Sequence, residues 1–353
     1  MKRQYKFIAT LLILTFASFA NGRTRYFELK TLKKGKELSF PVFSRTNDSI
    51  ATKNINQLLQ LSELELLDGY QTNNIFEKVS IDNGTIYGGK VEISYQLFSN
   101  NSKLLSIKFS ESSCGATCAY WVRYYNFNSG NGDLIKLKDL FTPKGFTAFS
   151  RNVLKKRTTK FKKQLTKIDS SERENFLDVL SCYENDDLHD YYIKGTSIII
   201  DGENCLSKNQ KFDGLDMITR FDFAEFKNCL NNYGKVVFGM TNDSISEYHS
   251  YVLPQLFEGT IGSSLKILLI INHGYKNKMR GVYAYLKYGR GIYLEGELND
   301  QELSMTENTE DFNENGYLNA TFDGKEINGT WTNKKKTKTL KFIAIRRIAM
   351  TQQ

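Results

Sequence analysis

The spacing of apolar residues changes several times along the chain, and each change predicts a different kind of structure. Residues 25–43 have the pattern of extended chain. Apolar residues then recur at helical spacing before Gly69 and predict one amphipathic helix over residues 50–67: Ile55, Leu58, Leu59 and Leu66. From 76 to 137 the alternation has period two and is broken by polar turns, which predicts antiparallel strands.

Three more helices are expected between residues 143 and 234. The first follows Pro143, and its apolar positions are Phe146, Phe149, Val153, Phe161 and Leu165. The second begins at Ser171 and the third runs from Asp222 to Gly234, each with a glutamate in capping-box spacing. Tyr191 to Asp201 is rich in isoleucine and predicts a strand. The first unit is therefore expected to be an α+β domain, an antiparallel sheet with helices, over residues 23–240.

Beyond a polar segment at 241–256, expected to be a linker, helical spacing disappears. Short alternating runs recur about every ten residues from 257 to 345. Glycine-containing turns such as 288–291 and 323–325 suit hairpins. This pattern predicts an all-β domain over 257–353, a meander of seven or eight strands that closes as a small barrel or a sandwich.

The first twenty-two residues resemble a secretory leader. Lys2, Arg3 and Lys6 precede an uncharged apolar run at 7–16, and small residues then offer a cleavage site near Ala20 to Gly22. We therefore expect a periplasmic or secreted protein that does not span the membrane. Nucleic acid is not an expected partner in that compartment.

The composition favours an ordered protein with a mild positive charge. The chain has 20 Tyr, 24 Phe and only 3 Pro, which favours an ordered, sheet-rich protein over a disordered one. Its formal net charge is +9. Loss of the three basic residues of the leader would lower this to +6, since the leader holds no acidic residue.

Five cysteines in an exported chain indicate disulfides before they indicate metal ligands. Cys114 and Cys118 flank a short loop with a glycine, so a local bridge is the preferred pairing. Cys182 with Cys205 is the second choice. Cys229 is then left as a thiol on a helix, and a bridge from Cys205 to Cys229 is the alternative.

No motif of a known catalytic class is present. His189, His249 and His273 are far apart in the sequence, so the zinc sites of deacetylases and zincins are not expected, and Walker, Rossmann and GxSxG signatures are missing. We expect no catalytic residue, no metal site and no cofactor. Three carboxylate pairs could serve a glycosidase but are better explained as surface residues: Glu63/Glu65, Asp186/Asp187 and Glu295/Glu297.

The segment Asp311 to Gly316 matches the first half of a calcium-binding loop. Phe322 stands where such a loop needs its bidentate glutamate, and strands are expected on both sides. A polar hairpin turn is the better interpretation, and calcium binding is left open.

Two features are candidate binding surfaces. Residues 144–167 carry nine Lys or Arg and no acid, and the candidates among them are Lys155, Lys156, Arg157, Lys160 and Lys163. They could meet an acidic partner or an anionic polymer, or form a solvated face neutralised by acids of the next helix. Tyr283, Tyr285 and Trp331 could stack on sugar rings, although packing in the core is the favoured reading.

The first unit also resembles the extracytoplasmic domain of RsiV-type anti-sigma factors, which also precedes the catalytic domain of some peptidoglycan deacetylases. The resemblance covers about residues 40–240 and rests on these segments: Ile55-Asn56, Val91–Tyr95, Leu104–Ile107, Tyr125–Asn128 followed by Gly130–Gly132, Leu134–Phe141 and Leu230–Gly234. It departs from the family at the Cys114–Cys118 loop. The anti-sigma members bind lysozyme, so the resemblance implies an envelope protein-binding module. The C-terminal part resembles uncharacterised β-rich modules of exported bacterial proteins.

Together these features favour a non-enzymatic binding protein of the cell envelope, whose ligand is lysozyme or another envelope protein, or a cell-wall glycan. One alternative is a hydrolase acting on wall glycan through its carboxylates. Another is a structural partner in an envelope complex. The sequence does not settle the ligand or the oligomeric state.

Overall fold

The structure is a computed structural model, and it describes residues 25–46, 50–70, 74–80, 89–170, 173–207, 210–250, 253–274, 276–308 and 315–347. The expected leader at 1–22, the expected helix start at Ser171 and residues 311–314 of the candidate calcium turn lie outside the described residues.

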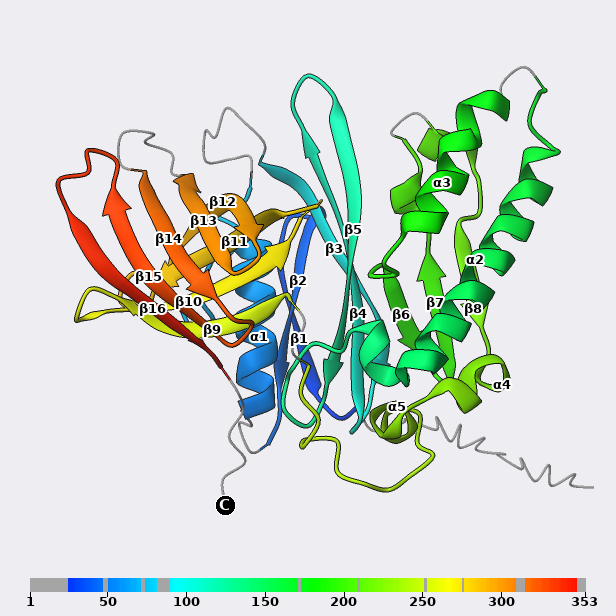
Figure 1. Ribbon diagram of the computed structural model, residues 1–353, viewed down its shortest axis with the longest axis horizontal. Coiled ribbons are helices and arrows are strands. Elements are labelled where there is room, and N and C mark those ends of the chain that lie inside the picture. Colours follow the sequence, from blue (N-terminus) through cyan, green and yellow to red (C-terminus); the bar gives the residue numbers. More distant parts are fainter. Residues whose placement is uncertain are drawn as a thin grey trace, which may run out of the picture.

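Three strand systems make up the fold (Figure 1): a five-stranded sheet, a three-stranded sheet and a closed eight-stranded barrel. The five-stranded sheet stands between the other two. The expected fold class, an α+β part followed by an all-β meander, is confirmed. Of the two closures that the strand spacing allowed, the structure has the barrel.

The five-stranded sheet has the order β1-β2-β3-β4-β5. Its strands are β1 Glu28–Lys34, β2 Leu38–Ser44, β3 Lys90–Asn100, β4 Leu104–Cys114 and β5 Cys118–Asn128. Neighbours are antiparallel except β2 and β3, which meet in parallel. The parallel pair is possible because the chain crosses over through a helix between these two strands.

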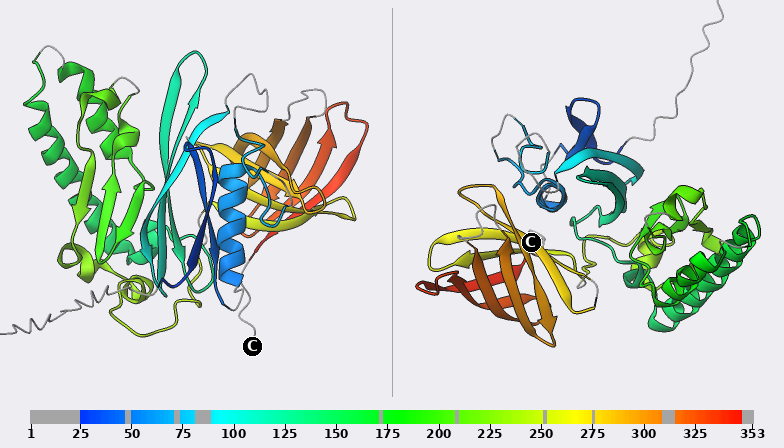
Figure 2. Two further views of the ribbon diagram at one scale, coloured as in Figure 1. Left: turned by 180° about the vertical axis from the view of Figure 1, so that it is seen from behind. Right: turned by 90° about the horizontal axis from the view of Figure 1, so that it is seen from above.

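That helix, α1 (Ile50–Leu64), lies between the sheet and the barrel (Figure 2). Ile55 and Leu59 on it are fully buried, in one apolar cluster that also contains Leu268 and Ile270 from the outside of the barrel. The helix ends three residues earlier than predicted, because Glu65 has a positive φ of 52°. Because α1 has apolar neighbours on both sides, the cluster continues from the sheet to the barrel.

A helical lobe follows on the other side of the sheet. Its elements are η2 Leu137–Leu140, α2 Pro143–Leu165, η3 Arg173–Phe176, α3 Leu177–Asn185, β6 Tyr191–Lys194, β7 Ser197–Asp201, η4 Glu203–Cys205, η5 Gln210–Asp213, β8 Ile218–Phe221, α4 Phe223–Phe226, η6 Lys227–Cys229 and α5 Asn232–Val237. Thr142 caps α2 by accepting a hydrogen bond from the Gly145 amide at 3.0 Å, and Pro143 provides the first helical residue. The strand predicted at 191–201 is a hairpin of β6 and β7.

The single helix predicted from Asp222 to Gly234 is wrong. Its start is as expected, since Asp222 and Glu225 form a capping box. The chain becomes extended again at Leu230, which pairs with Phe141 in a β-bridge, and Asn231 then caps the separate helix α5. A long-range bridge has interrupted a locally favourable helix.

The barrel has the strand order β10-β11-β12-β13-β14-β15-β16-β9. Its strands are β9 Gln255–Ile261, β10 Leu265–His273, β11 Lys278–Tyr285, β12 Gly291–Asn299, β13 Glu302–Asn308, β14 Gly316–Phe322, β15 Glu326–Asn333 and β16 Thr339–Arg346. It closes because β16 pairs with β9. Buried side chains such as Phe257, Leu269 and Phe342 form an apolar cluster inside.

The connection before the barrel packs on the first unit. The Asn128 amide donates to the carbonyl oxygens of Ile245 at 2.7 Å and Tyr248 at 3.0 Å. Asp133 accepts from His249 at 2.7 Å and from Arg346 of the last barrel strand at 3.1 Å. Strand β9 begins at Gln255, inside the range expected to be a linker.

Within the described part of the chain, no helix has the length and apolarity needed to cross a bilayer.

Both preferred disulfides are confirmed: Cys114 pairs with Cys118 at the β4–β5 hairpin, and Cys182 pairs with Cys205. Cys229 is free and half-buried.

Loss of the Cys182–Cys205 bridge is expected to lower the free energy of unfolding by about 3 kcal/mol, and loss of the Cys114–Cys118 bridge by about 2 kcal/mol, because the longer loop gains more freedom in the unfolded chain. Urea denaturation of the paired Cys→Ser variants measures both values. Cys229→Ser is the control and should cost less than about 1 kcal/mol. Equal losses for the two bridges would contradict the loop-length argument.

Candidate functional site

A cleft of about 420 Å³ lies where the five-stranded sheet, the helical lobe and the barrel meet. Its lining comes from α1, β3, β5, the segment after β5, the segment before β6, and the barrel strands β10 to β12. Residues far apart in the sequence are therefore neighbours here. The charged and polar members used below are Glu63, Lys90, Arg123, Lys136, His189, Asp190, His273 and Arg280.

One wall of the cleft is a buried ionic cluster. Glu63 of α1 is fully buried and pairs with Lys90 at 3.3 Å and with Arg123 at 3.0 Å. The Lys90 ammonium also lies 2.6 Å from Glu111, whose other carboxylate oxygen accepts from the Trp121 indole at 2.6 Å. Two acids thus face two bases, which allows the charges to be buried.

The two carboxyl groups of this cluster have opposite pKa shifts. Burial alone would raise the pKa of Glu63, but Arg123 and Lys90 outweigh it and hold that pKa well below the usual range. Burial and the negative charge of Glu63 raise the pKa of Glu111 well above the usual range. The expectation that Glu63 and Glu65 are ordinary surface carboxylates is wrong for Glu63, because α1 turns this side chain toward the sheet.

Lys136 is the most distinctive cation of the cleft. It is half-buried in the segment after β5, and among the described residues its ammonium has no ion pair and no hydrogen bond. Burial lowers the pKa of Lys136 to about 8, although Asp187, Asp139 and Asp190 attract the charged form. A desolvated ammonium without a partner favours an anion that enters the cleft.

Two of the three histidines, His189 and His273, lie in the same cleft although they are far apart in the sequence. The ring of His189 is hydrogen-bonded to Asp187, and this bond raises the pKa of His189 to about 9. Burial together with Lys136 and Lys138 lowers the pKa of His273. At neutral pH His189 is therefore a cation and His273 is neutral.

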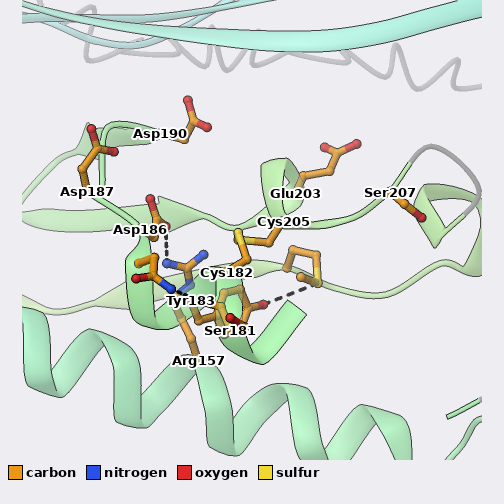
Figure 3. Close-up of a disulfide and its surroundings, with 12 residues drawn as sticks. Arg157, Ser181, Cys182, Tyr183, Asp186, Asp187, Asp190, Glu203, Cys205 and Ser207 are labelled. Carbon is orange, nitrogen blue, oxygen red and sulfur yellow. Dashed lines mark hydrogen bonds and ion pairs between the residues drawn. A yellow bond between two sulfur atoms is a disulfide. The ribbon is translucent and has the colours of Figure 1, made fainter. Parts of the chain in front are cut away.

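Next to the cleft, Asp186, Asp187 and His189 bring three potential metal-ligand atoms within 4.8 Å of one another. Asp186, however, already pairs with Arg157 at 2.5 Å (Figure 3). A cation at this point would have to displace the guanidinium, so these residues do not form a ready-made metal site.

Arg157 was expected on an exposed binding face, and that expectation is wrong. Only 1% of its surface is exposed, and its guanidinium lies over the Tyr183 ring at 3.9 Å (Figure 3). Arg157 lies on the same side of α2 as Val153 and Phe161, which pack inward. It is out of reach of any partner.

The other candidates on α2 divide into two groups. Lys156 pairs with Glu225 at 3.0 Å and Lys160 with Asp216 at 2.6 Å, so carboxylates already neutralise both. Lys155 and Lys163 are exposed, and no acid among the described residues pairs with them.

The candidate aromatic strip lies in the barrel wall and core. Tyr283 is 1% exposed, and its hydroxyl donates to the buried Glu307. The Trp331 indole also donates to Glu307, at 2.6 Å. Tyr285 is partly buried and packs edge-on against Tyr283. These rings line the barrel, and Tyr283 is out of reach of a sugar.

Comparison with known proteins does not identify a family. No protein-family model matches the sequence, and no curated protein matches it. Among solved structures, a member of the DUF3298 family from Bacteroides fragilis has a TM-score of 0.44 and 12% sequence identity, covering 62% of this chain and 99% of that chain. A likeness at that level carries no argument about function, and kinship with the RsiV-type module stays a prediction.

No motif or charge run in the sequence marks Lys90, Glu111, Arg123 or Lys136 as site residues. The one available signal was alternation, because a charged residue on the inward face of a predicted strand needs a partner. Glu111 on β4 and Arg123 on β5 are charged residues at such inward-facing strand positions. For Lys136, which lies in an irregular segment, the sequence holds no such signal.

Proposed function

We propose that this protein is a non-enzymatic binding protein of the cell envelope, and that the cleft takes a carboxylate-bearing fragment of cell-wall glycan. The unpartnered ammonium of Lys136 is the observation that carries this proposal. Three more cations line the cleft, and each already has a carboxylate partner: Arg123 pairs with Glu63, Arg280 with Glu295 and His189 with Asp187.

Aromatic residues in the same lining support a sugar as the ligand. The side chains of Tyr124 and Tyr293 are half-buried and line the cleft with the cations. Ring faces of this kind pack against the apolar faces of sugars, while cations recognise their carboxylates. Such a pocket suits a carboxylated sugar better than lysozyme, a basic protein.

Binding rather than hydrolysis is proposed because of where the paired acids lie. Glu63 is fully buried and Glu111 is 3% exposed. Each already has basic or hydrogen-bonding partners, so neither is directed at a bound glycosidic oxygen. A turnover assay on labelled peptidoglycan tests this point, and release of glycan by the unchanged protein would support the hydrolase alternative.

Lys136→Met is expected to weaken binding of the peptidoglycan disaccharide GlcNAc–MurNAc by about ten- to a hundredfold, because a charged hydrogen bond to its carboxylate is lost. Titration calorimetry on the oxidised full chain measures this. For the unchanged protein, affinity should be constant below pH 7 and fall by up to about tenfold per pH unit above pH 8, as Lys136 loses its proton. The variant should lack the decrease between pH 8 and 9 and keep only the weaker decrease that follows when His189, whose pKa is about 9, loses its proton.

Lys138→Met is the matched control, because Lys138 is exposed two residues away and does not line the cleft. It should bind like the unchanged protein. Chitobiose, which has the same rings without a carboxylate, should bind far more weakly. Equal affinity for both sugars, or no binding of either, would rule out the proposal. Tight binding of lysozyme that is unaffected by Lys136→Met would instead support the protein ligand implied by the resemblance.

A further inference from the structure

Helix α2 carries a straight row of cations on its outer face. Lys144, Arg151, Lys155 and Lys162 are all exposed, and they follow one another at intervals of seven, four and seven residues. At 3.6 residues per turn, these intervals place all four within an arc of about 40°, along about 27 Å of helix. We call these four residues the α2 stripe.

The stripe differs from Lys156 and Lys160 of the same helix, whereas Lys163, beside the stripe, is exposed and like the stripe has no carboxylate partner among the described residues. Lys156 and Lys160, which point toward β8 and the segment before it, have carboxylate partners. Among the described residues, no stripe member has one. The acids of the next helix that could have neutralised the stripe, Glu174 and Asp178, form no ion pair with it, and Glu172 lies outside the described residues.

The surroundings of the stripe favour a polymer over a membrane. Small residues, Ala148 and Thr159, separate the cations, so that a chain can approach the helix closely. A helix that lies on a bilayer needs an apolar face to insert, but Phe149 and Phe161 of α2 are buried in the lobe. The helix lies at the outer edge of the molecule, on the side away from the barrel (Figures 1 and 2).

We propose that the α2 stripe is a docking surface for a linear anionic polysaccharide. Aligned charges that lack internal partners attract a polyanion, and each contact that forms releases counterions from both surfaces. This site is separate from the cleft and does not depend on the function proposed for it. It would hold the protein on an acidic polymer of the envelope.

The test is binding of the full chain to immobilised polygalacturonate, a linear carboxylated polymer, with neutral dextran as the reference surface. Changing the four stripe residues together to Gln should weaken binding at least about tenfold. It should also make the dependence of affinity on salt shallower, since fewer counterions are released.

A second quadruple variant provides the control for net charge. Changing Lys266, Lys335, Lys338 and Lys341 of the barrel, all exposed, to Gln removes the same four charges elsewhere. This variant should bind like the unchanged protein. Equal losses in both variants, or no binding of polygalacturonate by the unchanged protein at physiological ionic strength, would overturn the proposal. Binding to phosphatidylglycerol vesicles in place of the polymer would overturn it in favour of a membrane surface.

Discussion

Glu63→Gln is expected to lower the free energy of unfolding by about 3 kcal/mol, because it removes one partner of a buried ionic cluster. Lys90 is only 12% exposed in its side chain, so water cannot replace the lost carboxylate. Tyr125 and Arg123 would also lose a charged acceptor. Urea denaturation at neutral pH, followed by circular dichroism, measures the change.

Glu92→Gln on β3 is the control for this change. Glu92 is exposed, so its substitution should alter stability by less than about 0.5 kcal/mol. Adding Lys90→Met to Glu63→Gln should cost less than the sum of the two single changes, because the second change removes a charge that has already lost one of its two carboxylate partners. Additive costs would contradict a coupled cluster.

Glu307→Gln is expected to destabilise the barrel by about 3 kcal/mol, because three donors converge on this buried carboxylate. One oxygen accepts from Tyr283 and from Trp331, and the other accepts from the Gly316 amide at 2.7 Å. A glutamine has only one acceptor oxygen. Its NH₂ group, which is a donor, would face either the donor N–H of Gly316 or the donors of Tyr283 and Trp331. Thermal unfolding followed by tryptophan fluorescence, which reports on Trp331 of the barrel and on Trp121 of the sheet, measures the loss.

The matched control is Glu302→Gln, on the exposed face of the same strand β13. It should leave the melting temperature nearly unchanged. If Glu307→Gln were equally harmless, Glu307 would not hold the three segments together, and Tyr283 would be freer to reach a ligand than the structure shows.

Residue patterns predicted the structure correctly where it depends on residues close together in the sequence. Alternation in 257–345 predicted strands that close on themselves, because each run buries one face and neighbouring runs are joined by short turns. Cys114 and Cys118 were paired correctly because only three residues of a hairpin lie between them. Asp222 was correctly placed at a helix start, since a capping box depends only on residues three apart.

Patterns were misleading where distant segments meet. The helix predicted from Asp222 to Gly234 is broken because Leu230 pairs with Phe141, about ninety residues earlier in the chain. Arg157 was taken for a surface residue because it stands in a run of lysines, yet Asp186 and Tyr183 enclose it.

The sequence by itself determined most of the local elements, the strand alternation of the barrel and the pairing of Cys114 with Cys118, because these follow from periodicity and from neighbours along the chain. Only the tertiary structure determined which residues line the cleft. Glu63 lies 27 residues from Lys90 and 60 from Arg123 in sequence. Whether such charges become a buried cluster or a solvated surface depends on which faces the sheet and α1 turn toward each other. Lys136 becomes a half-buried cation of the cleft only because residues of the lobe and the barrel line the cleft with it.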